Sequence, residues 1–222
     1  MLSIVVGILP GIVFSIMFFL FDQNRRNIKI PFLLMAFFCG CLSSYLCYRL
    51  EWHFGSYFKK VADSNLLEVF FYALFGVAIF EEGSKLFFSL LFIWLNKIRK
   101  KTNIITYAVV TSCGFLAFEN AVFYAAKYGL GCAVGRLFTS SPSHICFAVV
   151  MGFILCKFLD KNTNKLVLLL LALFLPSVIH AIYNMFLYQN ISSLYIYTHW
   201  FLFLLVVVCI FVVRKTYFKE NN

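Results

Sequence analysis

The sequence is poor in charge, and in negative charge above all. Only 13% of its 222 residues are charged and only 9 are Asp or Glu, whereas a soluble globular domain carries about 25% charged residues. Proline, with 4 residues, and glycine, with 11, are also scarce, which excludes disordered, collagen-like and low-complexity chains. By contrast, 63% of the residues are hydrophobic and 20% are aromatic. The composition excludes an ordinary water-soluble fold and predicts a membrane protein.

No Cys-X-X-Cys pair is formed by the 8 cysteines, and most of them lie inside apolar runs. They are interpreted as small packing residues, with no disulfide framework or structural zinc motif. The formal net charge of +10 would suggest a nucleic-acid partner in a soluble domain, but the 19 basic residues lie almost entirely between the apolar runs. That placement is typical of residues that face anionic lipid headgroups. We therefore expect the lipid bilayer, and no nucleic acid, as a partner.

Seven apolar runs have about the 20 residues that a helix needs to cross the hydrocarbon core. They cover residues 3–21, 30–48, 66–95, 104–126, 143–159, 166–188 and 194–213. These runs predict an all-α, multi-pass bundle of about seven transmembrane helices in the cell membrane. No hydrophilic stretch is long enough for a second folded unit, so residues 1–222 are expected to form a single domain. The first run is interpreted as a retained anchor, because no small-residue cleavage site follows it.

The third run is too long for one untilted crossing. It is either a short re-entrant or interfacial helix followed by a crossing that starts near Gly76, or one long tilted helix, and it counts as one crossing in both cases. Lys and Arg counted on alternate sides then number 13 on one side and 5 on the other, the five including Lys127 and Arg136. Because positive residues concentrate on the cytoplasmic side, the count predicts an N-terminus outside and a C-terminus in the cytoplasm.

Several polar residues lie within or at the ends of the predicted spans. Four of them are charged: Glu81, Glu82, Lys85 and Glu119. The uncharged ones that accompany them are Asn120, His144, His180 and Asn184. An ionisable group inside a membrane costs about 2.5 to 3.5 kcal/mol on insertion scales, so these groups must face one another, a ligand or water. They are the candidate functional residues.

The spacing of these residues predicts that they converge. On a helix, Glu81 lies four residues and Glu82 three residues before Lys85, so the lysine can reach either carboxylate. His180 and Asn184 are again four residues apart and share one face of the sixth span. With the predicted topology, the polar residues of four separate spans fall in the outer half of the bilayer.

The candidate residues together contain three carboxylates, one ammonium, two imidazoles and two carboxamides. A carboxylate and an imidazole can activate water by general-base action, or can bind a Zn²⁺ that lowers the pKa of its bound water. The formal surplus of two negative charges would be neutralised by one divalent cation or by two protonations. The His-Glu-X-X-His zinc motif is absent from the sequence. The residues alone leave zinc-dependent and metal-free mechanisms both open.

The same residues fall into four short motifs. These are Glu81-Glu-Gly-Ser-Lys85 (EExxK), Phe115-Leu-Ala-Phe-Glu-Asn120 (FxxxEN), His144 with Phe147 and Gly152, and His180-X-X-X-Asn184 (HxxxN). In this order, within residues 81–184 of a multi-pass chain, they resemble the PrsW family of intramembrane proteases. The wider group of CAAX-prenyl endopeptidases and Abi-type proteins typically shows EExxxR and FxxxH instead. The pattern therefore favours the PrsW branch and disfavours prenylated substrates.

The resemblance implies an activity as well as a fold. It implies a protease that makes the first, outer-side cut (site-1 cleavage) in a membrane-anchored anti-sigma factor, which releases a sigma factor and starts a cell-envelope stress response. It further implies that Glu81 and Glu82 activate water or bind a metal. His180 would act as a ligand, an acid–base group or an oxyanion donor.

The resemblance also implies roles for the other motif residues. Glu119 and His144 would complete the catalytic site, and Asn120 and Asn184 would orient it as hydrogen-bond donors. Lys85 would be the charge partner that fixes the geometry of the glutamate pair. If zinc is bound, the candidate ligands are Glu82, Glu119, His144 and His180.

The main alternative is a secondary transporter or ion pathway, because intramembrane carboxylates and histidines also mark proton and cation routes. No internal repeat of the kind found in many transporters is visible in the sequence, which favours the enzyme. A non-catalytic scaffold explains least, since it needs no buried carboxylates. Simpler structural interpretations also stay open: Glu81 and Glu82 as an interfacial pair at a helix start, and His180 with Asn184 as an interhelical hydrogen bond.

Overall fold

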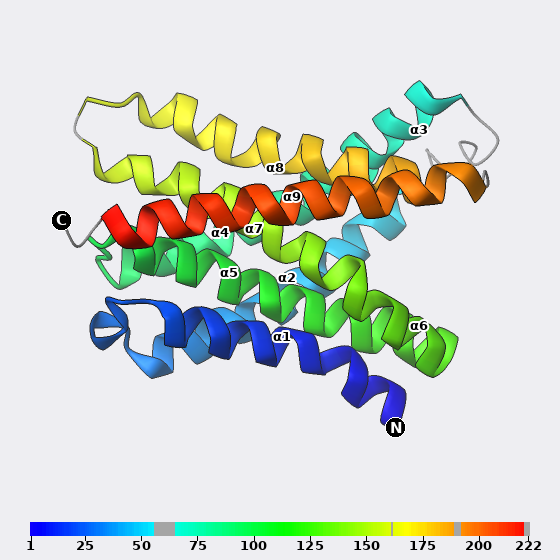
Figure 1. The fold of residues 1–222 in the computed structure, drawn as a ribbon, viewed down its shortest axis with the longest axis horizontal. Coiled ribbons are helices and arrows are strands. Elements are labelled where there is room, and N and C mark those ends of the chain that lie inside the picture. Colours follow the sequence, from blue (N-terminus) through cyan, green and yellow to red (C-terminus); the bar gives the residue numbers. More distant parts are fainter. Residues whose placement is uncertain (56–64, 161, 189–191, 220–222) are drawn as a thin grey trace.

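The structure is a computed structural model, and it describes residues 1–55, 65–160, 162–188 and 192–219 (Figure 1). Over these residues the regular elements are all helical, which confirms the all-α prediction. The α-helices are α1 (Leu2–Phe21), α2 (Ile30–Gly55), α3 (Leu66–Tyr72), α4 (Ile79–Leu95), α5 (Lys101–Phe118), α6 (Ala126–Phe138), α7 (Ser140–Cys156), α8 (Lys165–Tyr188) and α9 (Ser192–Lys219). Two π-helical segments, η3 (Ala73–Ala78) and η4 (Glu119–Ala125), join α3 to α4 and α5 to α6. Short 3-10 turns lie at η1 (Arg25–Asn27) and η5 (Lys157–Leu159).

Within the described chain, 6 helices are long and apolar enough to cross a membrane. They are α1, α2, α7, α8, α9 and the unit formed by α5, η4 and α6. The third predicted crossing consists of α3, η3 and α4, which run without a break from residue 66 to residue 95. It is therefore one helix with a π-helical segment around Gly76, not two separate helices. Helix α1 begins at one end of the bundle and α9 ends at the other (Figure 1), as an odd number of crossings requires.

Helix α5 lies at the centre of the bundle, with every residue from 102 to 117 buried. It packs against α1, α2, α4, α7 and α9. Glycine makes the crossing with α2 very close: a Cβ on Gly114 would overlap the backbone carbonyl of Phe37, and a Cβ on Gly40 would overlap that of Thr111. Between helices in lipid the hydrophobic effect supplies little attraction, so small residues stabilise such crossings by letting the backbones approach and gain van der Waals contact.

A buried polar cluster joins three helices at the end of the bundle where α9 terminates. The carboxylate of Asp22, which directly follows α1, is completely buried. It accepts hydrogen bonds from the Thr106 hydroxyl of α5 at 2.8 Å and from the backbone N–H of Asn24 at 2.9 Å. The Tyr217 hydroxyl of α9 lies 3.2 Å from that of Thr106. A buried polar group is costly unless it is hydrogen-bonded. These contacts therefore stabilise the packing of α1, α5 and α9 against one another.

The two π-helical segments adjoin the charged motifs. Segment η3 directly precedes α4, which carries Glu81, Glu82 and Lys85, and segment η4 begins at Glu119. A π-helical turn closes its hydrogen bond one residue later than an α-helical turn, so it changes the direction in which neighbouring side chains point. Such turns occur frequently at functional sites, and here all three glutamates of the motifs lie in or within four residues of one.

Candidate functional site

The charged residues of the apolar helices are buried together. Relative exposure is 0% for Glu82, 1% for Lys85 and 3% for His144, and both Glu81 and His180 are also buried. They come from α4, α7 and α8, with Glu119 added from η4. The structure thus brings together residues that are distant in sequence, such as Glu82 and His180, which are in contact although 98 positions separate them.

The ammonium of Lys85 lies at the centre of this group. Its Nζ is 2.8 Å from Oε1 of Glu82 and 3.4 Å from Oε2 of Glu81. It is also 2.9 Å from Nδ1 of His144 and 4.1 Å from the ring centroid of Phe115. The lysine therefore reaches both carboxylates, as the spacing on the helix predicts, and it links α4 to α7.

The contacts of His144 define its tautomer. An ammonium can only donate hydrogen bonds, so Nδ1 of His144 must accept one from Lys85. The ring proton then lies on Nε2, which is 3.1 Å from Oε2 of Glu119. The negative charge of Glu119 beside Nε2 favours a proton on that nitrogen, and the close contact restricts the orientation of the ring. His144 is therefore a neutral imidazole bridging Lys85 and Glu119.

Arg136, in the last turn of α6, was not among the site residues that the sequence predicted. Its guanidinium NH2 lies 2.8 Å from Oε2 of Glu119 and donates to Oγ of Ser140 at 2.7 Å. Its Nε donates to Oδ1 of Asn120 at 2.5 Å, and its Cζ lies 3.6 Å from the ring centroid of Tyr124. The sequence offered one weak signal, an arginine in a stretch between two spans where Lys127 is the only other charged residue. The topology count treated it only as an outer-side charge.

His180 of α8 forms a second pair with a carboxylate. Its Nδ1 is 2.9 Å from Oε1 of Glu82, and its ring stacks on Phe147 of α7 with centroids 4.6 Å apart. Because the carboxylate of Glu82 only accepts, Nδ1 of His180 carries the proton and Nε2 keeps its lone pair. This is the arrangement in which a carboxylate orients a histidine that acts as a base.

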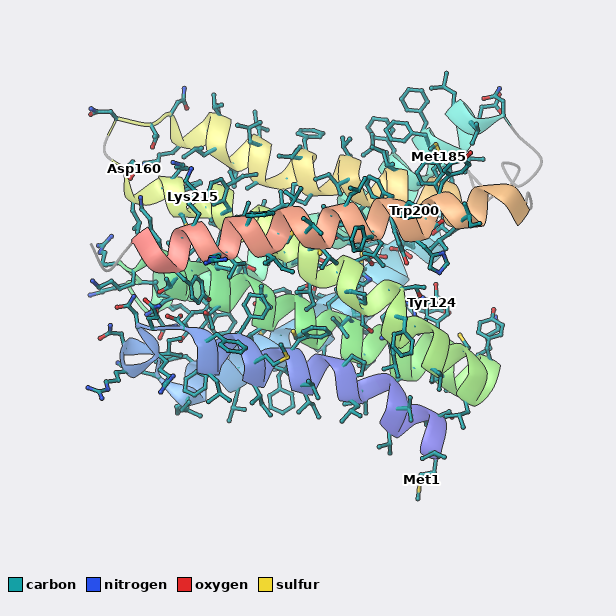
Figure 2. The ribbon with its side chains drawn as sticks, viewed as in Figure 1. Met1, Tyr124, Asp160, Met185, Trp200 and Lys215 are labelled. Atoms are coloured by element: carbon teal, nitrogen blue, oxygen red, sulfur yellow. The ribbon has the colours of Figure 1, made fainter. Side chains whose placement is uncertain are left out.

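A cavity of about 290 Å³, called the chamber below, lies beside these residues. Five predicted site residues line it: Glu81, Glu119, His144, His180 and Asn184. The other three, Glu82, Lys85 and Asn120, do not line the chamber but contact residues that do. Figure 2 labels Tyr124, a lining residue, in the half of the bundle away from Asp160 and Lys215. The chamber therefore lies toward the end where α1 begins.

The chamber is also lined by a carboxylate and a thiol that the sequence analysis did not single out. Glu51 and Cys47 both come from α2, and the thiol of Cys47 donates to Oε1 of Glu51 at 3.5 Å. The charge balance of the site changes accordingly. Arg136 reduces the surplus of two negative charges to one, and Glu51 returns it to two. The site as a whole thus has a formal surplus of negative charge, with Lys85 and Arg136 as its two cations.

Glu81, Glu82 and His144 form a group that suits a metal ion, since one ligand atom from each lies within 4.8 Å of the others. Catalytic zinc sites also use three protein ligands, and carboxylate oxygen and imidazole nitrogen are both zinc donors. Oε2 of Glu82 is also buried without a hydrogen-bond partner in the described chain, so it has capacity for a cation. The predicted ligand candidates Glu82 and His144 belong to this group, whereas Glu119 and His180 lie outside it.

A multi-pass helical bundle with carboxylates and imidazoles around an internal chamber is the arrangement of an intramembrane enzyme or of an ion pathway. The sequence profile of the "PrsW family intramembrane metalloprotease" matches residues 29–213. The chain therefore belongs to the PrsW family of intramembrane proteases, and it is a multi-pass membrane protein with a protein substrate. This membership decides between the enzyme and the transporter in favour of the enzyme.

Curated relatives agree with this assignment. The chain is 27% identical to Protease PrsW of Oceanobacillus iheyensis over 224 residues, covering 100% of this chain and 99% of the relative. It is 26% identical to Protease PrsW of Halalkalibacterium halodurans, covering 85% and 82%. A shorter match to Protease PrsW of Clostridioides difficile is 31% identical and covers 38% of each chain. No solved structure matches the chain.

Proposed function

We propose that this protein is a single-domain endopeptidase that cuts a membrane-anchored anti-sigma factor, or a similar single-span protein, in the outer half of the bilayer. The observation that carries the proposal is the lining of the chamber. It includes a carboxylate, Glu81, and an imidazole, His180, that is oriented by a second carboxylate, Glu82. Peptide hydrolysis needs a water, a base for its proton and a donor to the leaving amine. The chamber walls contain groups for each of these tasks.

We assign the base to His180. Its Nε2 lone pair accepts a proton from the water whose oxygen attacks the scissile carbonyl carbon, while Glu82 stabilises the imidazolium. The same nitrogen then delivers the proton to the amide nitrogen as the carbon–nitrogen bond breaks, so protons balance. Glu81 accepts a hydrogen bond from the attacking water, and Asn184 donates to the substrate carbonyl. Glu82 acts through His180, because it does not line the chamber.

The residues present also fit the metal that the family description implies. Glu81, Glu82 and His144 would hold it. A bound divalent metal would lower the pKa of its water and polarise the scissile carbonyl. His180 lies outside the metal-binding group, so its Nε2 would stay available as a base beside a bound metal.

The position of the chamber supports a cut on the outer side. The basic side of the bundle, which includes Lys215, lies at one end, and the chamber lies toward the other (Figure 2). With the cytoplasmic side assigned to the basic end, the chamber falls in the outer half of the membrane. A substrate segment near the outer surface would then be the one that reaches His180.

Cleavage by purified protein tests the proposal. A membrane-anchored anti-sigma factor is incubated in nanodiscs with wild type and His180→Asn, with and without a chelator. We expect the variant to cleave the substrate about 10²-fold more slowly, or slower still, as for removal of a general base. His199→Asn changes an exposed histidine of α9 and serves as the matched control. Equal cleavage by wild type and His180→Asn would reject the assigned base, and no cleavage by wild type would reject the proposed substrate.

A further inference from the structure

Among the described residues Arg136 has four partners, as many as Lys85 at the centre of the site. Its guanidinium contacts a carboxylate, a carboxamide and a hydroxyl, and it lies on an aromatic ring. Its side chain is only 16% exposed. Only arginine presents several N–H donors in one rigid plane, so these contacts use the geometry of the guanidinium as well as its charge.

The contacts of Arg136 join two parts of the chain that meet at the chamber. Glu119 and Asn120 begin η4, whereas Ser140 begins α7 four residues after the arginine. Between them, Gly129 interrupts the helical backbone with a φ of 82°, a conformation that glycine adopts readily. This break allows the last turn of α6 to turn its arginine back toward η4.

The oxygen that Arg136 contacts also meets His144. Oε2 of Glu119 is 2.8 Å from NH2 of Arg136 and 3.1 Å from Nε2 of His144. The contacts continue from His144 to Lys85 and from Lys85 to Glu82. A displacement of Glu119 would therefore release the ring of His144, whose other nitrogen faces the catalytic group.

We propose that Arg136 is a positioning residue of the protease: it fixes Glu119 and Asn120, and through Glu119 it holds His144 with the proton on Nε2 and the lone pair on Nδ1. The inference rests on the proposed function for its consequence in catalysis, but the tautomer of His144 is a property of the resting protein. A carboxylate behind a ligating or catalytic histidine sets ring orientation and basicity. Arg136 does not contact the histidine; it contacts the carboxylate of Glu119.

A double-mutant cycle tests the catalytic part. Arg136→Met and Glu119→Gln are each expected to lower kcat by about 10- to 100-fold, with little change in KM. Mutation of the residues that orient a ligating histidine has effects of this size. The double variant should be no worse than the poorer single variant, because both changes break the same chain of contacts. Additive losses, or a loss confined to KM, would show that Arg136 contacts substrate directly and would overturn the proposal.

Two further variants complete the design. Arg136→Lys keeps the charge but loses the planar guanidinium, so its kcat should be lowered as in Arg136→Met. Added guanidinium should partly restore the activity of Arg136→Met. Lys127→Met removes an exposed cation from the same helix and should behave as wild type. Full activity of Arg136→Lys would show that charge alone suffices, which contradicts the positioning role.

The tautomer itself is measured without any substrate. Nitrogen-15 NMR of histidine-labelled protein distinguishes the protonated from the unprotonated ring nitrogen, and His144→Asn assigns the signals. Wild type and Lys127→Met should show one tautomer with the proton on Nε2, and Arg136→Met should show a mixture. An unchanged spectrum in Arg136→Met would overturn the inference even if cleavage were lost. The expected change would support it even if the proposed substrate were wrong.

Discussion

The ammonium of Lys85 lies 2.9 Å from Nδ1 of His144, at the point where the ligand atoms of Glu81, Glu82 and His144 also converge. A divalent cation bound by these three residues would take nearly the same position. Two cations cannot share a buried site of this size, because their repulsion is strong in an environment of low dielectric constant. Lysine and metal are therefore alternative occupants of one place.

Lys85→Met should accordingly bind Zn²⁺ at least about tenfold more tightly than wild type, where tenfold corresponds to about 1.4 kcal/mol. The change removes the competing ammonium and leaves the two buried carboxylates, Glu81 and Glu82, without their cationic partner. Equilibrium dialysis of detergent-purified protein followed by metal analysis gives the affinity, and Lys85→Arg, which keeps a cation, should not gain any. Weaker zinc binding by Lys85→Met would show that the lysine supports the metal site instead of occupying it.

Gly114→Ala should destabilise the bundle. The added Cβ would overlap the carbonyl of Phe37 in α2, and overpacking of this kind costs about 1 to 3 kcal/mol. The free energy of unfolding is measured in mixed micelles of increasing SDS content. Gly131→Ala is the matched control, because its Cβ meets no atom within 4 Å. Equal stability of the two variants would mean that α2 and α5 do not approach as closely as the structure shows.

Asp22→Ala should lower stability by about 1 to 3 kcal/mol, the cost of leaving buried hydrogen-bonding groups without their partner. The carboxylate ties α1 to Thr106 of α5, so cleavage chemistry should survive under conditions where the fold persists. Asp160→Ala breaks an exposed ion pair with Lys101 and should cost at most about 1 kcal/mol. The same unfolding assay compares them, and a smaller effect at Asp22 than at Asp160 would contradict the structural tie.

The topology prediction is tested by reporter fusions. A fusion after residue 101 should report the cytoplasm, and one after Lys127 should report the outside, because basic residues concentrate on the inner face. Cysteine labelling with a membrane-impermeant reagent gives an independent readout of the same positions. The opposite pattern would place the chamber in the inner half of the membrane and contradict an outer-side cut.

Some features of this protein follow from the sequence alone because they depend on local spacing. The lengths of the apolar runs predict the helices to within a few residues in most cases, since a crossing helix must match the hydrocarbon thickness. The reach of Lys85 to Glu81 and Glu82 follows from helical periodicity. The third span was ambiguous, because no sequence pattern distinguishes a continuous helix with a π-helical segment from two helices.

Other features were decided only by tertiary structure. Sequence spacing cannot show which glutamates face the chamber, yet Glu81 lines it and Glu82 stands behind His180. Nor can it show that Arg136, counted as a charge outside the membrane, turns back to hold Glu119. These relationships join side chains on different helices, and they depend on how close the helices pack and where their backbones bend. Local periodicity determines the face of a helix on which a residue lies, whereas packing determines what that face meets.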